Sequence, residues 1–386
     1  AFAWFFGDGS AAYLSICQGR KDTLKATKAI GTCFTLNLIA SLLLMVFSLV
    51  FMDPILVLFG ATESILPLAR EYLFILAFFF PFFMVVNMFE CDIRADGSPV
   101  FSMVCTGCGA VLNIILDPIF ILVFDMGMKG AAIATIIGQV VSFAVCLCYL
   151  PKSKTFHLTW KSMVPDLKSA LDAFGLGLST FITQLAIVIV SLTCNQVLSK
   201  YGALSKYGTD IPISIMAIQT KVFTIVINIV VGIVLGSQPI VGYNMGAGNL
   251  SRVKKTYFLI LVSTLIVGLL FTILFVFFPK AVLMIFGSVD DALYVEFGER
   301  FFRVFLSTIT LCCFIKMSAI FFQAVGHPME AILCSLCRDI LVFVPTILLL
   351  AYLGEKEEPG NGILLSLYAP IVADVIAKSV AFSQPS

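Results

Sequence analysis

The sequence predicts an all-α polytopic membrane protein, and three observations lead to this prediction. Hydrophobic residues make up 60% of the 386 residues and charged residues only 12%, about half the charged share of an average soluble protein. Apolar stretches of about 20 residues, the length that crosses a bilayer as a helix, recur along the whole chain. None of them shows the short alternating pattern that is typical of a membrane β-barrel. We therefore expect the chain to lie in a lipid bilayer.

The apolar stretches predict eleven membrane-spanning helices. They lie near residues 1–17, 29–52, 67–90, 98–124, 129–150, 170–199, 210–244, 254–278, 295–323, 330–353 and 361–382. The 210–244 stretch is longer than a bilayer requires and contains Pro239, so we expect this helix to be tilted or broken. The chain begins with Ala1 inside an apolar stretch that resembles the middle of a helix, and we expect a further helix before it.

Basic residues cluster in three predicted loops. The clusters are Arg20, Lys21, Lys25 and Lys28; Lys152, Lys154, Lys161 and Lys168; and Arg252, Lys254 and Lys255. If the spans alternate in direction, the three loops face one side, which the positive-inside rule makes cytoplasmic. We expect a multi-pass protein of the plasma membrane with a cytoplasmic C-terminus. The formal net charge of +1 argues against a nucleic-acid partner.

An internal repeat with a spacing of about 228 residues relates the two halves of the chain. Gly9 aligns with Gly236 and Pro118 with Pro345, both at a shift of 227 residues. Parallel repeats of this kind form the two lobes of many carriers. We expect two pseudo-symmetric helix bundles around a central cavity, in a twelve-helix fold without its first helix. The expected parts are an N-terminal lobe at 1–155, a cytoplasmic linker at 156–169 and a C-terminal lobe at 170–386.

An acidic residue inside a membrane span is costly and is therefore a candidate for function. Asp117 follows Asn113 by four residues, so the two side chains share one helix face. Pro118 deprives the carbonyl of Ile114 of its helical hydrogen-bond donor. These oxygen atoms suit a proton or a hard cation such as Na⁺, so Asp117 and Asn113 are candidates for cation coupling. The alternative is a carboxylate near a helix end that reaches water and takes no part in coupling.

Further polar residues fall inside the predicted spans of the second half. They are Gln184, Asn195, Gln219, Lys221, Lys316, Gln323, Arg338, Asp339, Asp374 and Lys378. Five of them are candidates for a substrate cavity, namely Gln184, Asn195, Gln219, Lys221 and Gln323. The alternative is that such side chains only form hydrogen bonds with neighbouring helices. For Arg338 and Asp339 we expect local pairing near the inner end of a helix.

No sequence motif supports an enzyme. The chain lacks a P-loop, an HExxH segment and a GxSxG segment. Cys105 and Cys108 have CxxC spacing, as do Cys334 and Cys337. Both pairs lie in or near predicted spans, where we expect packing rather than zinc or redox chemistry. A membrane-embedded enzyme would need a cluster of catalytic acids or histidines at one depth, so we expect neither catalysis nor a cofactor.

Four segments resemble the motifs of a known family, the multidrug and toxic compound extrusion (MATE) transporters. Arg94–Pro99 is similar to its Arg-x-x-Gly-x-Pro loop, and Asn113–Phe120 to its asparagine–aspartate–proline helix. Gly127–Thr135 resembles the start of the following helix, and Gly236–Ala247 resembles the Gln-Pro-x-x-Gly-Tyr-Asn-x-Gly-Ala signature. The resemblance extends over the whole chain and is closest to the bacterial drug-efflux branch.

The resemblance implies two six-helix lobes and export of amphipathic, often cationic, drugs by alternating access in exchange for H⁺ or Na⁺. It places the ligands of the coupling cation on Asn113, Asp117 and Thr135. The span that would carry a glutamate in another branch has Gln184 instead, which favours coupling in the N-terminal lobe. It also implies small-molecule substrates and a monomer in the lipid bilayer. A flippase for lipid-linked oligosaccharides is the alternative; it needs a basic cavity, which Lys221 and Lys316 would permit.

Overall fold

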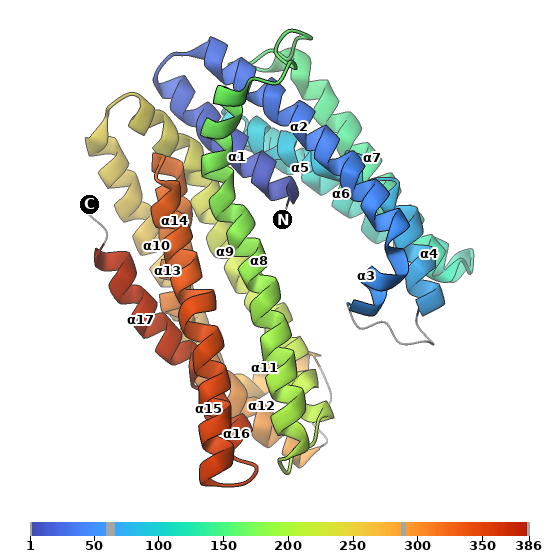
Figure 1. Ribbon diagram of the computed structural model, residues 1–386, viewed down its shortest axis with the longest axis vertical. Coiled ribbons are helices and arrows are strands. Elements are labelled where there is room, and N and C mark those ends of the chain that lie inside the picture. Colours follow the sequence, from blue (N-terminus) through green and yellow to red (C-terminus); the bar gives the residue numbers. More distant parts are fainter. Residues whose placement is uncertain (1, 59–65, 287–290, 384–386) are drawn as a thin grey trace. The chain divides into compact units, whose positions relative to one another are not determined.

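The computed structural model describes residues 2–58, 66–286 and 291–383, and in these ranges it contains helices and no strand (Figure 1). The elements are α1 (Phe2–Gly19), α2 (Thr23–Val50), α3 (Met52–Leu58), α4 (Leu66–Ala77), α5 (Phe80–Ala95), α6 (Pro99–Pro118), η1 (Ile119–Val123), α7 (Gly127–Tyr149), η2 (Leu150–Lys152), α8 (Leu167–Ala203), α9 (Asp210–Gly246), α10 (Leu250–Phe277), α11 (Pro279–Phe286), α12 (Ala292–Phe305), α13 (Ile309–Val325), α14 (Pro328–Leu336), η3 (Cys337–Phe343), α15 (Val344–Glu357), α16 (Gly362–Ser366) and α17 (Ala369–Ser383). The predicted all-α fold is confirmed.

Within the described residues, nine of the eleven predicted spans are long and apolar enough to cross a membrane, if each of two bent helix pairs is counted as one span. Seven are single spans: Thr23–Val50, Pro99–Val123, Gly127–Lys152, Lys168–Ala203, Asp210–Gly246, Leu250–Phe277 and Pro328–Glu357. The other two are bent pairs, α4 with α5 at 58° and α12 with α13 at 47°. In the described ranges, the predicted spans at 1–17 and 361–382 correspond to α1 and to α16 with α17, which do not reach the same combination of length and hydropathy.

Of the two alternatives predicted for the 210–244 stretch, a tilted or a broken helix, the broken helix is wrong. Helix α9 continues over 37 residues from Asp210 to Gly246 with Pro239 in its interior. A proline removes one helical hydrogen bond, but the bonds on either side keep such a helix continuous inside a membrane protein. The sequence instead missed the bends within 67–90 and 295–323, each of which it predicts as one span.

The structure repeats its elements at the spacing found in the sequence. Helix α2 starts at Thr23 and α10 at Leu250, a shift of 227 residues, and α3 and α11 start at the same shift. The bend between α4 and α5 has its counterpart between α12 and α13. Both π-helical segments adjoin the aligned prolines, since η1 follows Pro118 and η3 ends two residues before Pro345. A proline disturbs the helical hydrogen bonds, and a π turn is one way to accommodate it.

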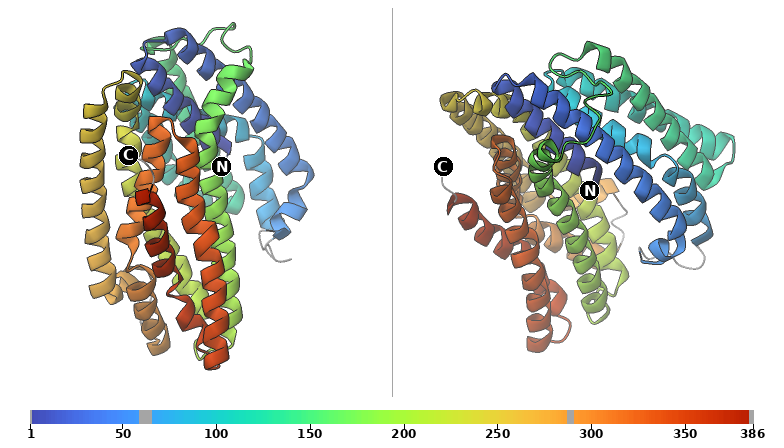
Figure 2. Two further views of the ribbon diagram at one scale, coloured as in Figure 1. Left: turned by 60° about the vertical axis from the view of Figure 1, so that its left-hand side comes forward. Right: turned by 45° about the horizontal axis from the view of Figure 1, so that its top comes forward.

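The chain divides into two compact units. Unit 1 comprises residues 1–178 and 242–249, and unit 2 comprises residues 179–241 and 250–386. In unit 1, α1 packs against α2 and α5, and α6 packs along α7, as both sets of views show (Figures 1 and 2). In unit 2, α10 packs against α13, and α17 packs against α13 and η3.

Asp96 fixes the loops at one end of unit 1. Its carboxylate accepts hydrogen bonds from the Tyr149 hydroxyl at 2.6 Å and from the backbone N–H groups of Lys154 at 2.8 Å and Thr155 at 3.0 Å.

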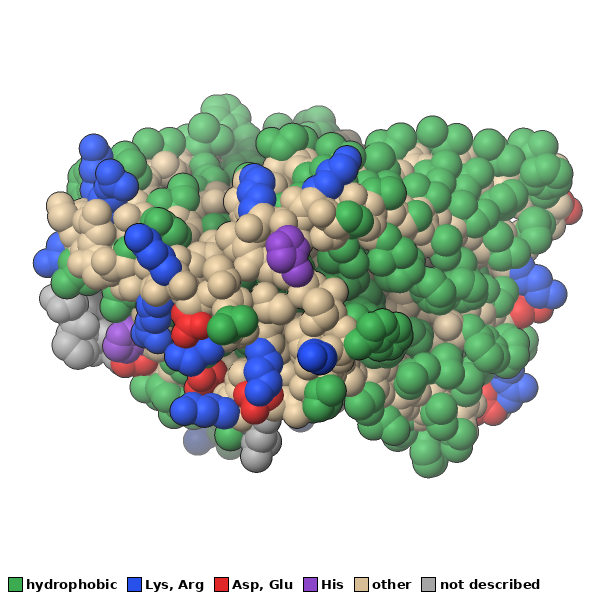
Figure 3. Space-filling model, turned by 90° about the horizontal axis from the view of Figure 1, so that it is seen from above, with side chains coloured by type: hydrophobic (Ala, Val, Ile, Leu, Met, Phe, Trp, Pro, Cys, Tyr) green, Lys and Arg blue, Asp and Glu red, His purple; other side chains and the backbone are tan. Residues whose placement is uncertain are grey.

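The Lys28 ammonium lies 3.4 Å from the carboxylate of Asp166, which joins the first basic cluster to the predicted linker. The face seen in Figure 3 carries more Lys and Arg than Asp and Glu side chains.

Glycines let α6 and α7 approach each other closely. A Cβ atom on Gly109 would lie 2.1 Å from the Oγ of Ser142 and 2.6 Å from the backbone oxygen of Gly138. No real Cβ atom occupies such positions, so larger residues would push the two helices apart. The same contact supports the half of α6 that carries Asn113, because a Cβ on Gly138 would also lie 3.4 Å from the Cβ of Asn113.

We predict that Gly109→Ala lowers the free energy of unfolding by about 1–3 kcal/mol, because it overpacks this helix crossing. Gly107→Ala on the same helix is the control, since its Cβ would meet no atom within 4 Å. That control should gain about 0.5–1 kcal/mol from the higher helix propensity of alanine. Denaturant titration of the purified protein in detergent measures both values, and equal effects of the two substitutions would contradict the packing argument.

Candidate functional site

The structure brings the three predicted cation ligands of unit 1 together. Asn113 and Asp117 lie on α6, and Thr135 lies on α7. The Asn113 Nδ2 lies 3.4 Å from Asp117 Oδ1 and 3.4 Å from Thr135 Oγ1, while the Thr135 hydroxyl donates to the backbone oxygen of Ala131 at 2.9 Å. All three side chains are partly exposed. The cluster therefore offers a carboxylate, an amide and a hydroxyl within one small space.

These groups suit a proton or a hard cation, because they supply oxygen atoms and one ionisable carboxylate. Amide oxygen and nitrogen are assigned from hydrogen bonding, so a rotated Asn113 amide would present its oxygen to a cation. No group of three or more His, Cys, Asp or Glu residues with metal-binding geometry occurs in the described residues. The role of Asn113, Asp117 and Thr135 in coupling stays a prediction.

Unit 1 also contains two deeply buried carboxylates that the sequence analysis did not single out. Asp8 on α1 is 4% exposed and Asp92 on α5 is fully buried. The Ser10 hydroxyl donates to Asp92 Oδ1 at 2.7 Å, and the guanidinium of Arg94 lies 3.7 Å from Asp8 Oδ1. Both acids lie on helices at or near predicted spans, so the rule that selected Asp117 would also have selected Asp8. Asp92 escaped it because α5 extends beyond the predicted end of its span.

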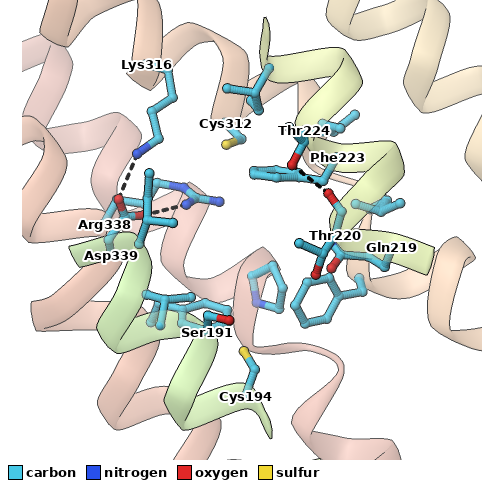
Figure 4. Close-up of a pocket in the computed structure, with 18 of the residues that line it drawn as sticks. Ser191, Cys194, Gln219, Thr220, Phe223, Thr224, Cys312, Lys316, Arg338 and Asp339 are labelled. Carbon is cyan, nitrogen blue, oxygen red and sulfur yellow. Dashed lines mark hydrogen bonds and ion pairs between the residues drawn. The ribbon is translucent and has the colours of Figure 1, made fainter. Parts of the chain in front are cut away.

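Unit 2 has a partly open cavity of about 380 Å³ (Figure 4). Its walls come from α8, α9, α12, α13, η3 and α17. The polar and charged residues that line it are Gln184, Ser191, Gln219, Thr220, Thr224, Asn228, Lys316, Arg338, Asp339 and Asp374. Aliphatic and aromatic side chains such as Ile187, Phe223 and Phe305 complete the lining. A mainly apolar cavity with a few polar groups on its walls has the general character of a small-molecule site.

Four charged side chains form a continuous network on one wall of this cavity. Lys316 Nζ lies 2.7 Å from Asp339 Oδ2, and Arg338 Nη1 lies 2.5 Å from Asp339 Oδ1. Arg338 Nε donates to Asp374 Oδ1 at 2.7 Å, and the Thr308 hydroxyl donates to Asp374 Oδ2 at 2.6 Å. The four charged side chains are at most 11% exposed. We call Lys316, Arg338, Asp339 and Asp374 the charge quartet.

The π-helical segment η3 explains why two adjacent residues both contribute to the quartet. In an α-helix, consecutive side chains point about 100° apart. A π turn holds more residues, so neighbouring side chains such as Arg338 and Asp339 diverge less around the helix axis. Figure 4 shows both beside Lys316 on one side of the cavity, with Gln219, Thr220 and Thr224 of α9 on the opposite side.

The structure places the five predicted cavity residues in different surroundings. Gln184 and Gln219 line the cavity of unit 2, whereas Asn195, Lys221 and Gln323 do not. Asn195 and Lys221 lie on exposed helix faces. Gln323 is buried and donates from Nε2 to the Thr180 hydroxyl at 3.1 Å, which is the helix–helix bonding considered as its alternative.

The quartet is the main feature that sequence reasoning missed. All four residues were recognised as polar residues within spans, and the local pairing expected for Arg338 and Asp339 is confirmed. Their burial was not expected, because Arg338 and Asp339 were predicted to lie near the inner end of a helix. The sequence could have indicated a buried charge network, because its last predicted spans contain basic and acidic residues together. Among these are Lys316, Arg338, Asp339 and Asp374.

A model of the MatE family matches residues 1–119 and 179–348 of the chain. The chain is 26% identical over 353 residues to the multidrug export protein MepA of Staphylococcus aureus strain MRSA252, covering 90% of this chain and 75% of that protein. It is 28% identical over 270 residues to MepA of Staphylococcus haemolyticus strain JCSC1435, covering 69% of this chain and 58% of that protein. The chain thus spans between about half and three quarters of these relatives.

Solved structures of MATE transporters and of a MOP superfamily transporter have a similar fold. A crystal structure of MATE in complex with MaL6 superposes with a TM-score of 0.88 at 20% identity, over 99% of this chain and 83% of that chain. A transporter of the MOP superfamily from Pyrococcus furiosus gives 0.88 at 20% identity, over 99% and 82%. A mutant of the Vibrio cholerae MATE transporter VcmN gives 0.86 at 19% identity, over 99% and 83%. These likenesses establish the fold of the described chain.

We predict that Asp339→Asn lowers the free energy of unfolding by about 3–5 kcal/mol, because it leaves the buried charge of Lys316 without its partner. Glu299→Gln is the matched control in the same unit, since Glu299 pairs with Arg303 on a partly exposed helix face at 3.0 Å. The control should cost about 0.3–0.5 kcal/mol. Denaturant titration in detergent measures both, and a loss from Asp339→Asn no larger than that of the control would show that the quartet does not stabilise unit 2.

Proposed function

Because the chain belongs to the MatE family, we propose that it is a multidrug efflux carrier of the cell membrane that exports amphipathic organic compounds by alternating access. The observation that carries this proposal is the family match across both halves, together with the similarity to proteins named as multidrug exporters. The predicted membrane spans and the repeated elements of the two units agree with a carrier rather than an enzyme. We propose that it works as a monomer with its C-terminus in the cytoplasm.

The cavity of unit 2 supports amphipathic substrates. Apolar side chains such as Ile187, Phe223 and Phe305 would cover the hydrophobic body of a bound compound, while Gln184 and Gln219 would bond its polar groups. Its volume of about 380 Å³ lies in the range of sites that hold drug-sized molecules. We propose that this cavity takes part in substrate binding.

The cluster of Asn113, Asp117 and Thr135 supports cation-coupled antiport. A carboxylate that exchanges a proton or a Na⁺ ion between the two sides of the membrane would link the gradient to export. Asn113, 3.4 Å from Asp117, would hold this carboxylate in place, and Thr135, 3.4 Å from Asn113, would complete an oxygen-rich site. We propose that H⁺ or Na⁺ binds at this cluster during the transport cycle.

The charges of unit 2 support the flippase alternative less well than they support a multidrug carrier. A lipid-linked pyrophosphate would call for several cations without local partners. Lys316 and Arg338 line the cavity but are matched by Asp339 and Asp374. Lys221, the other cation considered for this role, does not line it.

We predict that Asp117→Asn abolishes gradient-driven export, because asparagine neither releases a proton nor attracts a cation with a negative charge. The protein would be reconstituted into liposomes, and efflux of a fluorescent organic cation would be followed with an imposed H⁺ or Na⁺ gradient. Asp125→Asn is the control, since Asp125 is exposed just beyond η1 and its positive φ of 51° is one that asparagine tolerates. Gradient-driven export by Asp117→Asn at the rate of the control would refute the coupling role.

A further inference from the structure

The hydrogen bonds of the charge quartet leave N–H donors of both cations available. Each of the four carboxylate oxygens of Asp339 and Asp374 already accepts a hydrogen bond or pairs with a cation. Arg338 has five N–H donors and Lys316 has three. Within the described part of the chain, Arg338 uses Nε and Nη1 in these pairs and Lys316 makes one contact. Several N–H groups of the two cations therefore remain for another partner.

These donors face the cavity. Arg338 and Lys316 are only 11% and 10% exposed, and both line the cavity. In Figure 4 the end of the Arg338 guanidinium points away from Asp339 into the space in front of α9. Both cations contact the same carboxylate, Lys316 at Oδ2 and Arg338 at Oδ1 of Asp339.

The opposite wall offers no comparable charge. It consists of the α9 residues Gln219, Thr220, Phe223 and Thr224. The Thr220 hydroxyl donates to the Met216 carbonyl and the Thr224 hydroxyl to the Thr220 carbonyl, at 2.8 Å and 2.7 Å. This wall therefore suits an aromatic or aliphatic body, while the quartet wall suits an acceptor.

We propose that the cavity of unit 2 binds organic acids with an aromatic body, and that Arg338 and Lys316 hold their carboxylate. This inference rests on the proposed transport function and names the class of substrate that the cavity selects. A planar guanidinium edge matches a carboxylate, and such charge-assisted bonds are about twice as strong as neutral ones. Asp339 and Asp374 keep the two cations in place.

The charge of the quartet also limits what binds. Two cations and two carboxylates give it no net charge, so a single carboxylate adds one negative charge, whereas a pyrophosphate would add several. An organic cation that displaced Lys316 or Arg338 from a buried carboxylate would leave a buried charge without its partner at a high cost. A monovalent acid is therefore the class that fits best.

The test compares three probes with one aromatic body: 2-naphthoate, methyl 2-naphthoate and (2-naphthylmethyl)trimethylammonium. Equilibrium dialysis measures the binding of each to the purified protein in detergent at neutral pH. We expect 2-naphthoate to bind about tenfold tighter than its ester, as one charge-assisted hydrogen bond implies, and tighter than the ammonium compound. The variants Arg338→Gln and Lys316→Gln should reduce this preference, whereas Arg303→Gln, on the exposed face of α12, should keep it.

The relative binding of the three probes distinguishes loss of the carboxylate site from a general loss of stability of unit 2. A variant that only loosens unit 2 would weaken the binding of all three probes alike, while loss of the carboxylate site weakens 2-naphthoate selectively. If Arg338→Gln does not fold, stabilisation of the wild-type protein against heat by 2-naphthoate but not by its ester gives the same answer. Equal binding of acid and ester to the wild-type protein, or binding of none of the probes, would overturn the inference.

Export in liposomes distinguishes this failure from a failure of the proposed function. If the ammonium compound is exported under a cation gradient while 2-naphthoate is neither bound nor exported, the carrier function stands and the acid-binding role of Arg338 falls. If no compound is exported under either gradient, the proposed function itself fails.

Discussion

The buried pairing of Arg338 with Asp339 and Asp374 is the constraint on which unit 2 depends. It connects η3 with α17, and through Asp339 it extends to Lys316 on α13. Burying four charges is costly unless each finds its partner with good geometry. The three elements are therefore held in one arrangement, and the wall of the cavity that they form is fixed with them.

Unit 1 joins its helices through close backbone contacts as well as through buried polar pairs such as Arg94 with Asp8. Its helices approach at glycines, as Gly109 and Gly138 show, where backbone meets backbone without intervening side chains. Within a bilayer there is little hydrophobic drive for helices to associate, and close contact of small residues supplies dispersion energy instead. In the half-buried cluster around Asp117, the Asn113–Thr135 contact at 3.4 Å adds a polar link between the same two helices.

The sequence predicts the architecture well because the bilayer imposes it. Length and hydropathy locate nine helical spans, and the spacing between Gly9 and Gly236 reveals the repeat. The cluster of Asn113, Asp117 and Thr135 was also predictable, since helix periodicity and one family motif place all three. The cavity of unit 2 was not, because it depends on which faces of α8, α9 and α13 turn toward each other. Lys221 and Gln219 are two residues apart on one helix, yet only Gln219 lines the cavity.

Because η3 is π-helical, the orientation of Arg338 in the cavity depends on the number of residues in this span. A π turn amounts to one residue inserted into an α-helix, and it lies here between α14 and α15 in a single span. Removing one residue from Cys337–Phe343 would restore a regular helix without changing its hydropathy, but it would rotate the preceding turns by about 100° relative to those that follow. Arg338 would then turn away from Asp374. Relatives that keep this cavity should therefore tolerate substitutions in η3 more readily than deletions.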